Sequence, residues 1–187
     1  MKLSRLLLTA TLLAGAALAS AANPTPDWRQ ELKQALPALG HRNWIVVVDS
    51  AYPLQTAPGI RLVATGSDHF TVLREVLGAV QGAKHVRPRV YLDHELPFVA
   101  EQFAPGIGKL RSGLANALGT TSTVSLPHEQ IIRRLEEAGR SFQVLVLKTD
   151  LTLPYSSVFI ELECGYWTDE AEHALRDALA RAAAGAK

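Results

Sequence analysis

The segment Asn43–Asp49, which reads NWIVVVD, constrains the fold of this chain more than any other. Ile45 is followed by three valines with no polar residue between them, whereas a strand with one face in water alternates apolar and polar side chains. β-Branched residues favour extended backbone, and a continuous run of them is typical of a strand buried on both faces. Such strands lie inside sheets that helices cover, so the segment predicts an α/β protein.

The rest of the chain alternates between helical and extended patterns. Helices are expected in four segments with helical spacing or capping residues, at 28–39, 68–80, 129–139 and 169–184. Extended segments are expected where apolar residues run without helical spacing, at 60–64, 86–92, 120–126, 142–150 and 157–164. Proline and glycine residues divide 93–118 into two short helices. This alternation predicts helices that cover a sheet, in one domain spanning residues 22–187 with a single core.

Single residues set some of these boundaries. Thr25 or Asp27 is expected to cap the first helix, because a short polar side chain there accepts a hydrogen bond from a free backbone N–H. Pro88 lacks a backbone N–H, so the strand that contains it is expected to lie at an edge or to begin late. Gly139 is expected to end the helix that Pro127 opens.

The first 21 residues have the features of a secretory signal peptide. Lys2 and Arg5 precede an apolar stretch, and the small residues at 19–21 form a cleavage site. The alternative is an uncleaved membrane anchor, but the apolar stretch falls short of the roughly 20 residues that span a bilayer. We expect a periplasmic or secreted protein with no membrane-spanning segment.

The charge of the chain limits the classes of molecule that it is expected to bind, and its cysteine content limits its disulfides. The chain carries 19 Lys and Arg against 18 Asp and Glu, well mixed along its length. A chain without a basic stripe is not expected to bind nucleic acid, and a neutral small molecule fits better. Cys164 is the single cysteine, which excludes a disulfide within the chain.

Two polar residues flank the buried strand at positions where binding and catalytic residues are common. His41 follows Gly40, which is expected to end a helix, and Asp49 follows the strand directly. In open α/β sheets, ligands bind beyond the carboxyl ends of the strands, where Asp49 falls. On this pattern alone, a loop-capping aspartate and a surface histidine remain the alternatives.

Three stretches resemble, in order and spacing, the D-ribose pyranase and L-fucose mutarotase family. The first is Gly40-His41 followed by a buried strand that ends in Asp49. The second is Pro-His-Glu-Gln at 127–130, at the start of a helix, and the third is the Tyr-containing segment 153–160, which leads into the last strand. The matches extend from about residue 36 to residue 165.

The resemblance implies a three-layer α/β/α fold and a sugar isomerase that opens and recloses the ring of a monosaccharide without a cofactor or metal. It implies that His41 is the acid/base catalyst and that four residues contact the sugar: Asp49, His128, Tyr155 and Ser157. Histidine suits this chemistry because it exchanges protons near neutral pH. Ser157 stands where the family usually has Asn, so the alternative is a sugar-binding or structural oligomer without turnover.

The length of the strand adds a geometric constraint. Eight extended residues span up to about 26 Å at roughly 3.3 Å each, so His41 and Asp49 are expected at opposite ends of one strand. We therefore expect a homo-oligomer in which His41 of one subunit meets Asp49, His128 or Tyr155 of another. The ring-shaped oligomers of the family imply the same arrangement.

Other candidates have simpler interpretations. Residues 93–95 (Asp-His-Glu) suggest a metal site, but neighbouring residues of an extended segment point to opposite faces, so no metal is expected. His69, His85 and His173 are expected to be solvated. Cys164 is expected to be a buried apolar residue.

Overall fold

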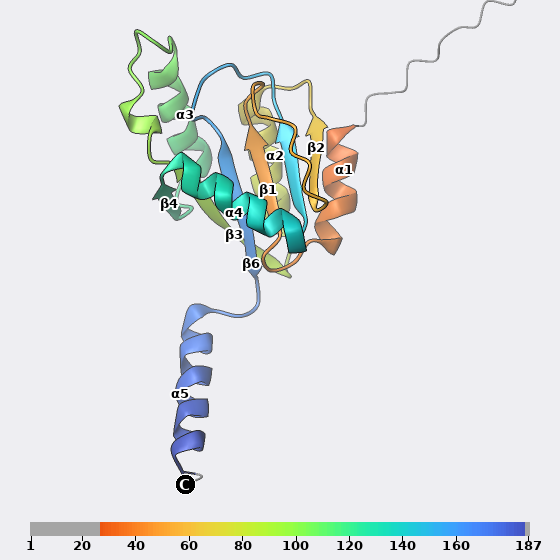
Figure 1. Cartoon of the computed structure of the whole chain (residues 1–187), viewed down its shortest axis with the longest axis vertical. Helices are drawn as coiled ribbons and strands as arrows, with labels where there is room; N and C mark the ends of the chain where they lie inside the picture. The colour runs from red at the N-terminus through yellow and green to blue at the C-terminus, as the bar shows by residue number, and fades with distance from the viewer. Residues whose placement is uncertain (1–26, 186–187) are drawn as a thin grey trace, which may run out of the picture.

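The structure, a computed structural model, describes residues 27–185, which are built around one six-stranded sheet (Figure 1). The predicted signal peptide, residues 1–21, lies outside the described residues. The strand order is β2-β5-β1-β6-β3-β4, and every strand except β6 runs in the same direction. The bounds are Trp44–Val48 (β1), Ile60–Ala64 (β2), Val86–Asp93 (β3), Thr123–Leu126 (β4), Val144–Lys148 (β5) and Val158–Cys164 (β6).

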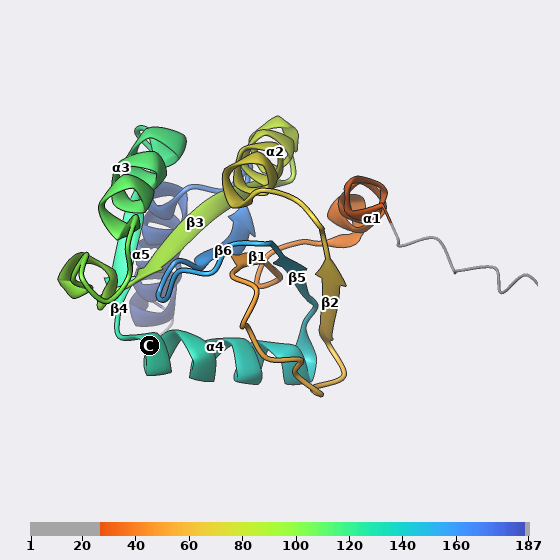
Figure 2. The same ribbon diagram turned by 90° about the horizontal axis from the view of Figure 1, so that it is seen from above.

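Helices cover both faces of the sheet and give the three layers of an α/β/α fold, as predicted (Figure 2). One face packs against α1 (Trp28–Ala35), α2 (His69–Gly82) and α3 (Ile107–Leu118). The opposite face packs against α4 (His128–Ser141).

Strand β1 explains why both faces must be covered. Ile45 and Val47 join the core under α1, α2 and α3, whereas Val46 and Val48 join the core under α4. None of these four side chains has any exposed surface. Removing a side chain of this size from water stabilises the fold by about 1.5–3 kcal/mol, so the continuous apolar run favours a central strand with two apolar faces.

The boundaries follow the predicted caps with three differences. Asp27 caps α1 as expected, since its side chain accepts a hydrogen bond from the backbone N–H of Arg29 at 3.0 Å. Pro88 lies inside β3, which begins at Val86, so of the two predicted alternatives, an edge or a late start, the late start is wrong. Strand β4 pairs with β3 only from Val90 onward, so at Pro88 that side of β3 is a free edge.

Two helical segments also differ from the prediction. Helix α4 runs two residues past Gly139 to Ser141, because Gly139 has ordinary helical backbone and packs closely against Ile60. The segment 93–118 contains a single turn of 3-10 helix, η2 (Leu96–Phe98), and then the twelve-residue α3. A similar turn, η1 (Leu36–Ala38), follows α1 at Pro37.

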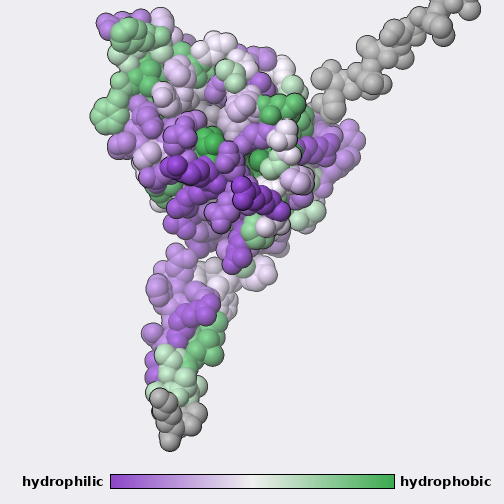
Figure 3. Space-filling view, viewed as in Figure 1, coloured by the Kyte–Doolittle hydropathy of each residue, from purple (hydrophilic) through white to green (hydrophobic). Residues whose placement is uncertain are grey.

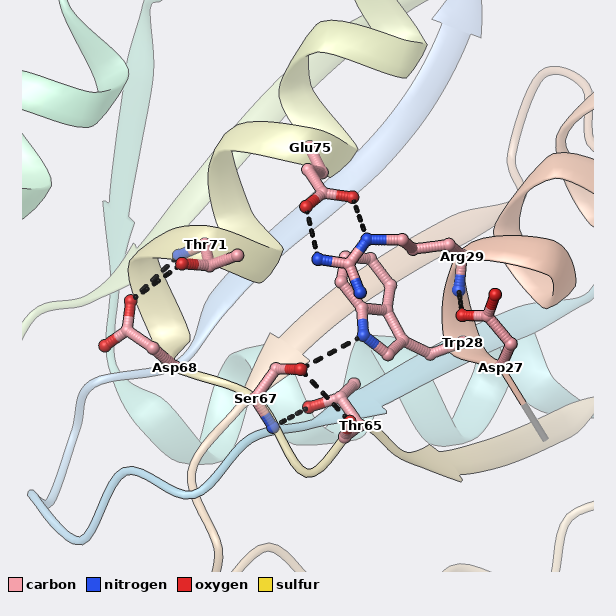
Figure 4. Close-up of polar contacts among 8 residues, drawn as sticks. All are labelled: Asp27, Trp28, Arg29, Thr65, Ser67, Asp68, Thr71 and Glu75. Atoms are coloured by element: carbon pink, nitrogen blue, oxygen red, sulfur yellow. Dashed lines mark hydrogen bonds and ion pairs between the residues drawn. The ribbon is translucent and has the colours of Figure 1, made fainter. Parts of the chain in front are cut away.

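Polar side chains join α1 to α2 (Figure 4). Arg29 of α1 donates two hydrogen bonds to the carboxylate of Glu75 on α2, at 2.8 and 2.6 Å. The indole N–H of Trp28 donates to the hydroxyl of Ser67 at 3.2 Å, just before α2. These contacts fix the two helices beside the end of β2.

The last helix, α5 (Asp169–Gly185), extends away from the sheet (Figure 1). None of its residues is buried. Within residues 27–185, no helix combines the length and the apolar character that crossing a membrane requires.

Candidate functional site

The parallel strands bring several polar residues to one edge of the sheet. Asp49 follows β1, Asp93 ends β3 and His128 follows β4, so all three lie at the carboxyl ends of parallel strands. Strand β6 runs in the opposite direction and therefore begins at this edge, directly after Ser157. We call this side of the sheet the carboxyl edge and the opposite side the amino edge.

Asp93 and His128 form the best-defined polar pair at the carboxyl edge. The Nδ1 atom of His128 lies 3.0 Å from Oδ1 of Asp93, whose side chain is fully buried. Both carboxylate oxygens of Glu95 accept the backbone N–H of His128, at 3.1 and 3.0 Å. Because His128 is the first residue of α4, its backbone N–H would otherwise lack a partner within the helix.

This arrangement determines which nitrogen of the neutral His128 ring carries the proton. A carboxylate only accepts, so Nδ1 donates to Asp93 and carries the proton. In the neutral ring, Nε2 is then the basic nitrogen. A histidine held by a carboxylate in this way accepts a proton at Nε2 while the carboxylate stabilises the resulting positive charge.

Burial raises the pKa of Asp93 from its usual 3.8 to about 6. The hydrogen bond and charge of His128 oppose this rise, whereas the carboxylates of Glu95 and Asp49 add to it. The second oxygen of Asp93, Oδ2, is buried without a hydrogen-bond partner in the described chain. Asp93 therefore changes protonation close to neutral pH.

Tyr155 stands beside this pair. Its ring lies edge-on to the His128 ring, with centroids 5.6 Å apart and an angle of 89° between the planes. The side chain is 38% exposed. Ser157, two residues on, is almost completely buried.

Backbone strain marks two positions of the resembling stretches. In residues 27–185, the non-glycine residues with positive φ are Arg42 at 72° and Tyr155 at 53°. Side chains disfavour this left-handed region, and such strain persists where the surrounding structure imposes it, often at functional sites. Arg42 directly follows the predicted site residue His41, and Tyr155 is itself a predicted site residue.

Asp49 occupies the neighbouring part of the carboxyl edge. It is half-buried, and its side chain accepts the backbone N–H of Ala51 at 2.8 Å, which is the loop-capping role that the sequence left open. Burial is the main cause of the raised pKa of Asp93 and of the raised pKa of Tyr52, and the negative charge of Asp49 adds to both shifts.

His69 contradicts its predicted solvation, since it is 1% exposed. Its Nδ1 lies 3.1 Å from the hydroxyl of Thr149, which itself donates to the carbonyl of Val48 at 2.8 Å. The hydroxyl has only one proton to donate, so Nδ1 of His69 must be the donor in their contact. Burial lowers the pKa of His69 to about 4, so the ring is neutral.

The remaining histidine and cysteine expectations have mixed outcomes. His85 is half-buried, and its Nε2 contacts the carbonyls of Leu36 and Leu39 at the end of η1, so its predicted solvation is wrong. Cys164 is partly exposed near the end of β6, so its predicted burial is also wrong. His173 is exposed on α5, as predicted.

His41 lies at the amino edge, in the turn before β1. The structure therefore places it at the opposite end of β1 from Asp49, as the strand length predicts. It lines a pocket of about 560 Å³ with residues from β6, from α5 and from the segment between them, among them Trp167 and Arg176. Within one chain, His41 does not meet the other four predicted site residues.

A second pocket, of about 480 Å³, lies between the ends of β2 and β5 and the start of α1. Its lining includes Thr65, Ser67 and Lys148. Much of this polar surface is already hydrogen-bonded within the chain, since the Thr65 hydroxyl donates to the carbonyl of Lys148. The Ser67 hydroxyl donates to the carbonyl of Thr65 and accepts the indole N–H of Trp28 (Figure 4). The contacts make this region part of the scaffold.

Asp93 and Glu95 are site residues that the sequence prediction considered only as part of a metal cluster and set aside. Asp93 ends a strand as Asp49 does, so its position at a carboxyl end was the available signal. In the described part of the chain, no cluster of three or more His, Cys, Asp or Glu residues is placed to hold a metal ion.

No protein-family model and no curated protein sequence matches the chain. Several solved structures are similar to it, including the three that follow. RbsD of Bacillus subtilis, solved with D-ribose, is 16% identical with a TM-score of 0.49, over 81% of this chain and 98% of its own. The fucose mutarotase of Streptococcus pneumoniae, solved with L-fucose, is 17% identical with a TM-score of 0.47, over 74% and 91%. FucU of Bifidobacterium longum is 16% identical with a TM-score of 0.46, over 72% and 94%.

Proposed function

We propose that this protein is a monosaccharide isomerase of the mutarotase or pyranase type, which opens and recloses the ring of a reducing sugar. The observation that carries the proposal is the Asp93–His128 pair at the carboxyl edge, with Tyr155 against the His128 ring. The resemblance of segments 40–49, 127–130 and 153–160 to the D-ribose pyranase and L-fucose mutarotase family supports the same chemistry.

The reaction needs two proton transfers. The anomeric hydroxyl loses its proton, the bond between the anomeric carbon and the ring oxygen breaks, and the ring oxygen gains a proton, which gives the open aldehyde. Reclosure reverses these steps on either face of the carbonyl. Nε2 of His128 takes the first proton, and Asp93 stabilises the charged imidazole ring.

The energy required is modest. A spontaneous process on the scale of minutes to hours has a barrier of about 21–23 kcal/mol, so a reduction of roughly 4–6 kcal/mol gives a 10³- to 10⁴-fold acceleration. One or two placed acid/base groups supply this amount.

His41 takes part as the second acid/base group, from a neighbouring subunit. Within one chain it lies at the amino edge, away from the Asp93–His128 pair. A site that contains both therefore requires the amino edge of one chain to meet the carboxyl edge of another. Light scattering that shows an active monomer would contradict this part of the proposal.

Saturation-transfer NMR tests the proposal on ribose, fucose and related sugars. We expect the protein to accelerate exchange between anomers or ring forms of at least one sugar. His128→Ala and His41→Ala are each expected to lower the rate by about 10²-fold or more, as for other acid/base groups. His173→Ala, an exposed histidine on α5, is the matched control and is expected to leave the rate unchanged.

A second function is favoured by one residue. Ser157 is buried and has a shorter side chain than the Asn usual in the family, so it offers fewer hydrogen bonds to a sugar. If sugar signals show binding while exchange is not accelerated, the protein is a non-catalytic sugar-binding protein. If no sugar binds, it is a structural oligomer.

We also propose that the protein acts in the periplasm or outside the cell, after removal of residues 1–21. The basic start, apolar stretch and small residues of this segment support export. Mass spectrometry of the mature chain is expected to show a protein that begins at Ala22. A cytoplasmic protein that retains residues 1–21 would contradict the proposal.

A further inference from the structure

Helix α5 is the element with the least contact to the rest of the fold. It spans seventeen residues, none of them buried, and extends beyond the amino edge (Figure 1). Leu175 and Leu179 lie one turn apart and are 42% and 54% exposed. Ala171, Ala178 and Ala182 fall at helical spacing beside them, and Figure 3 shows apolar surface along one side of the helix.

A matching apolar surface lies at the other end of the molecule. Phe98 and Phe103, between β3 and α3, are 75% and 82% exposed. Figure 3 shows apolar surface in this part of the molecule, over α3 and the segment before it. The Phe98 ring lies 5.5 Å from that of His94, the residue after Asp93. The patch therefore adjoins the Asp93–His128 pair.

Most of the exposed large apolar residues of the described chain lie near one of two ends. Three lie in loops or turns near the carboxyl edge: Phe98, Phe103 and Tyr155, whereas Leu54 lies beside the last turns of α4. The other four lie in α5 or just before it: Tyr166, Trp167, Leu175 and Leu179. Two apolar surfaces at opposite ends fit a head-to-tail contact between copies, in which one end of a chain meets the other end of its neighbour.

Individual charges of opposite sign that form no ion pair within the described residues also lie at the two ends. The carboxyl edge carries the carboxylates of Asp49 and Glu95, which form no ion pairs within residues 27–185. At the amino edge, the guanidinium of Arg42 likewise forms no ion pair in that range. A head-to-tail contact brings these opposite charges together.

The dimensions of α5 agree with this contact. Its first turns share a pocket with His41, through Asp169, Glu172 and Arg176. A helix of this length extends about 25 Å. When His41 reaches the Asp93–His128 pair of a neighbour, α5 lies within reach of that neighbour's Phe98 and Phe103.

We propose that α5 is an arm that packs on a second copy of this chain, with Leu175 and Leu179 against the other copy's Phe98 and Phe103. This inference rests on the head-to-tail contact of the proposed function. It adds a second interaction surface, on α5, that fixes how the two copies are oriented and that packs against the other copy's Phe98 and Phe103.

Disulfide cross-linking between two different variants tests the packing. In a Cys164→Ser background, chains with Leu175→Cys are mixed with chains with Phe98→Cys and oxidised with glutathione disulfide. We expect a covalent heterodimer. The matched control replaces Leu175→Cys by His173→Cys on the opposite side of α5, and it is expected to cross-link at least tenfold less.

Two results would overturn the proposal. One is equal cross-linking, or none, in the Leu175→Cys and His173→Cys mixtures. The other is preferential linkage between two Leu175→Cys chains, which would mean that α5 pairs with α5. The cross-linking readout needs no sugar. If Leu175→Cys and Phe98→Cys chains cross-link in a protein that does not accelerate sugar exchange, the proposed interface is supported while the proposed isomerase function is contradicted.

A second variant tests the contribution of the arm to assembly. Leu175→Glu with Leu179→Glu is expected to lower the oligomer mass in light scattering while circular dichroism stays unchanged, because neither leucine is buried within one chain. His173→Glu is the control and is expected to retain the oligomer. An unchanged mass in the double variant would contradict the proposal.

Discussion

Asp93 combines a cost in stability with a role in the proposed chemistry. Its carboxyl ionises near pH 6 in the folded protein and near pH 3.8 when unfolded. Both states are protonated below pH 3.8 and ionised above pH 6, so folding is disfavoured progressively between these values and fully above them. The folded protein bears this ionisation cost, and the same carboxylate holds His128 in position.

Asp93→Asn is therefore expected to increase stability and decrease activity. At pH 7.5 the substitution removes the ionisation cost, up to about 3 kcal/mol at roughly 1.4 kcal/mol per pKa unit, and at pH 4 it removes much less. Asn still accepts the Nδ1 proton but does not stabilise a charged His128, so sugar exchange falls. Urea unfolding of both proteins at pH 7.5 and pH 4 measures the effect. A stability difference that does not depend on pH would contradict it.

His69 predicts the opposite pH dependence. Its pKa is about 4 in the folded protein, against 6.5 in the unfolded chain. As pH falls from 6.5 to 4, the unfolded chain binds a proton that the folded chain does not, so stability falls by up to about 3 kcal/mol. His69→Asn removes this contribution. We expect the variant to be less stable than wild type at pH 7.5 and to approach it by pH 4.5, whereas exposed His173→Asn shows no such change.

Some residues of the candidate site were predictable and others were not. His128 and Tyr155 come together at the carboxyl edge from positions that the sequence singles out. The pairing of Asp93 with His128 was not predicted, because the two residues are 35 positions apart and nothing local indicates their contact. The burial of His69 was missed for the same reason, since the Thr149 hydroxyl that it contacts lies 80 residues further along the chain.

At the scale of elements, Gly59 joins β2, α4 and β5. Its N–H donates to the carbonyl of Gly139 at 2.8 Å, and its carbonyl accepts from Val144 at 2.8 Å. A Cβ at this position would overlap the backbone carbonyl of Phe142 and lie 2.7 Å from that of Gly139. Backbone atoms cannot move aside as flexible side chains do.

Gly59→Ala is accordingly expected to destabilise the fold by about 3 kcal/mol. Gly82→Ala is the control, since a Cβ at the end of α2 would meet no atom within 4 Å. There, alanine is expected to be neutral or to stabilise the helix by up to about 1 kcal/mol. Thermal unfolding of both variants gives the comparison, and equal melting temperatures would contradict the prediction.

Most elements were predictable because their signals are local. The buried run of β1, the cap at Asp27 and the alternation of helices and strands all lie within short segments. The end of α4 was not predictable in this way, because Gly139 serves the close approach of Ile60 rather than a helix end. Pro88 was compatible with β3 because β4 is too short to pair with it.

At the scale of the whole molecule, the order of the strands in the sheet could not be predicted from the sequence. Strand β1 pairs with β5, and Trp44 lies opposite Val144, one hundred residues along the chain. The reversed β6 lies on the other side of β1. This order brings Asp49, Ser157 and Asp93 to neighbouring strands, whereas His41 stays at the opposite edge.

A mixture of two inactive variants tests the shared site most directly. His41→Ala chains retain the Asp93–His128 pair, and His128→Ala chains retain His41. In a head-to-tail oligomer assembled from equal amounts of both, about one contact in four joins an intact His41 to an intact His128. We predict that saturation-transfer NMR of the co-refolded mixture shows sugar exchange at about a quarter of the wild-type rate. Exchange no faster than in either variant alone, from a mixture that assembles as wild type does, would contradict the shared site.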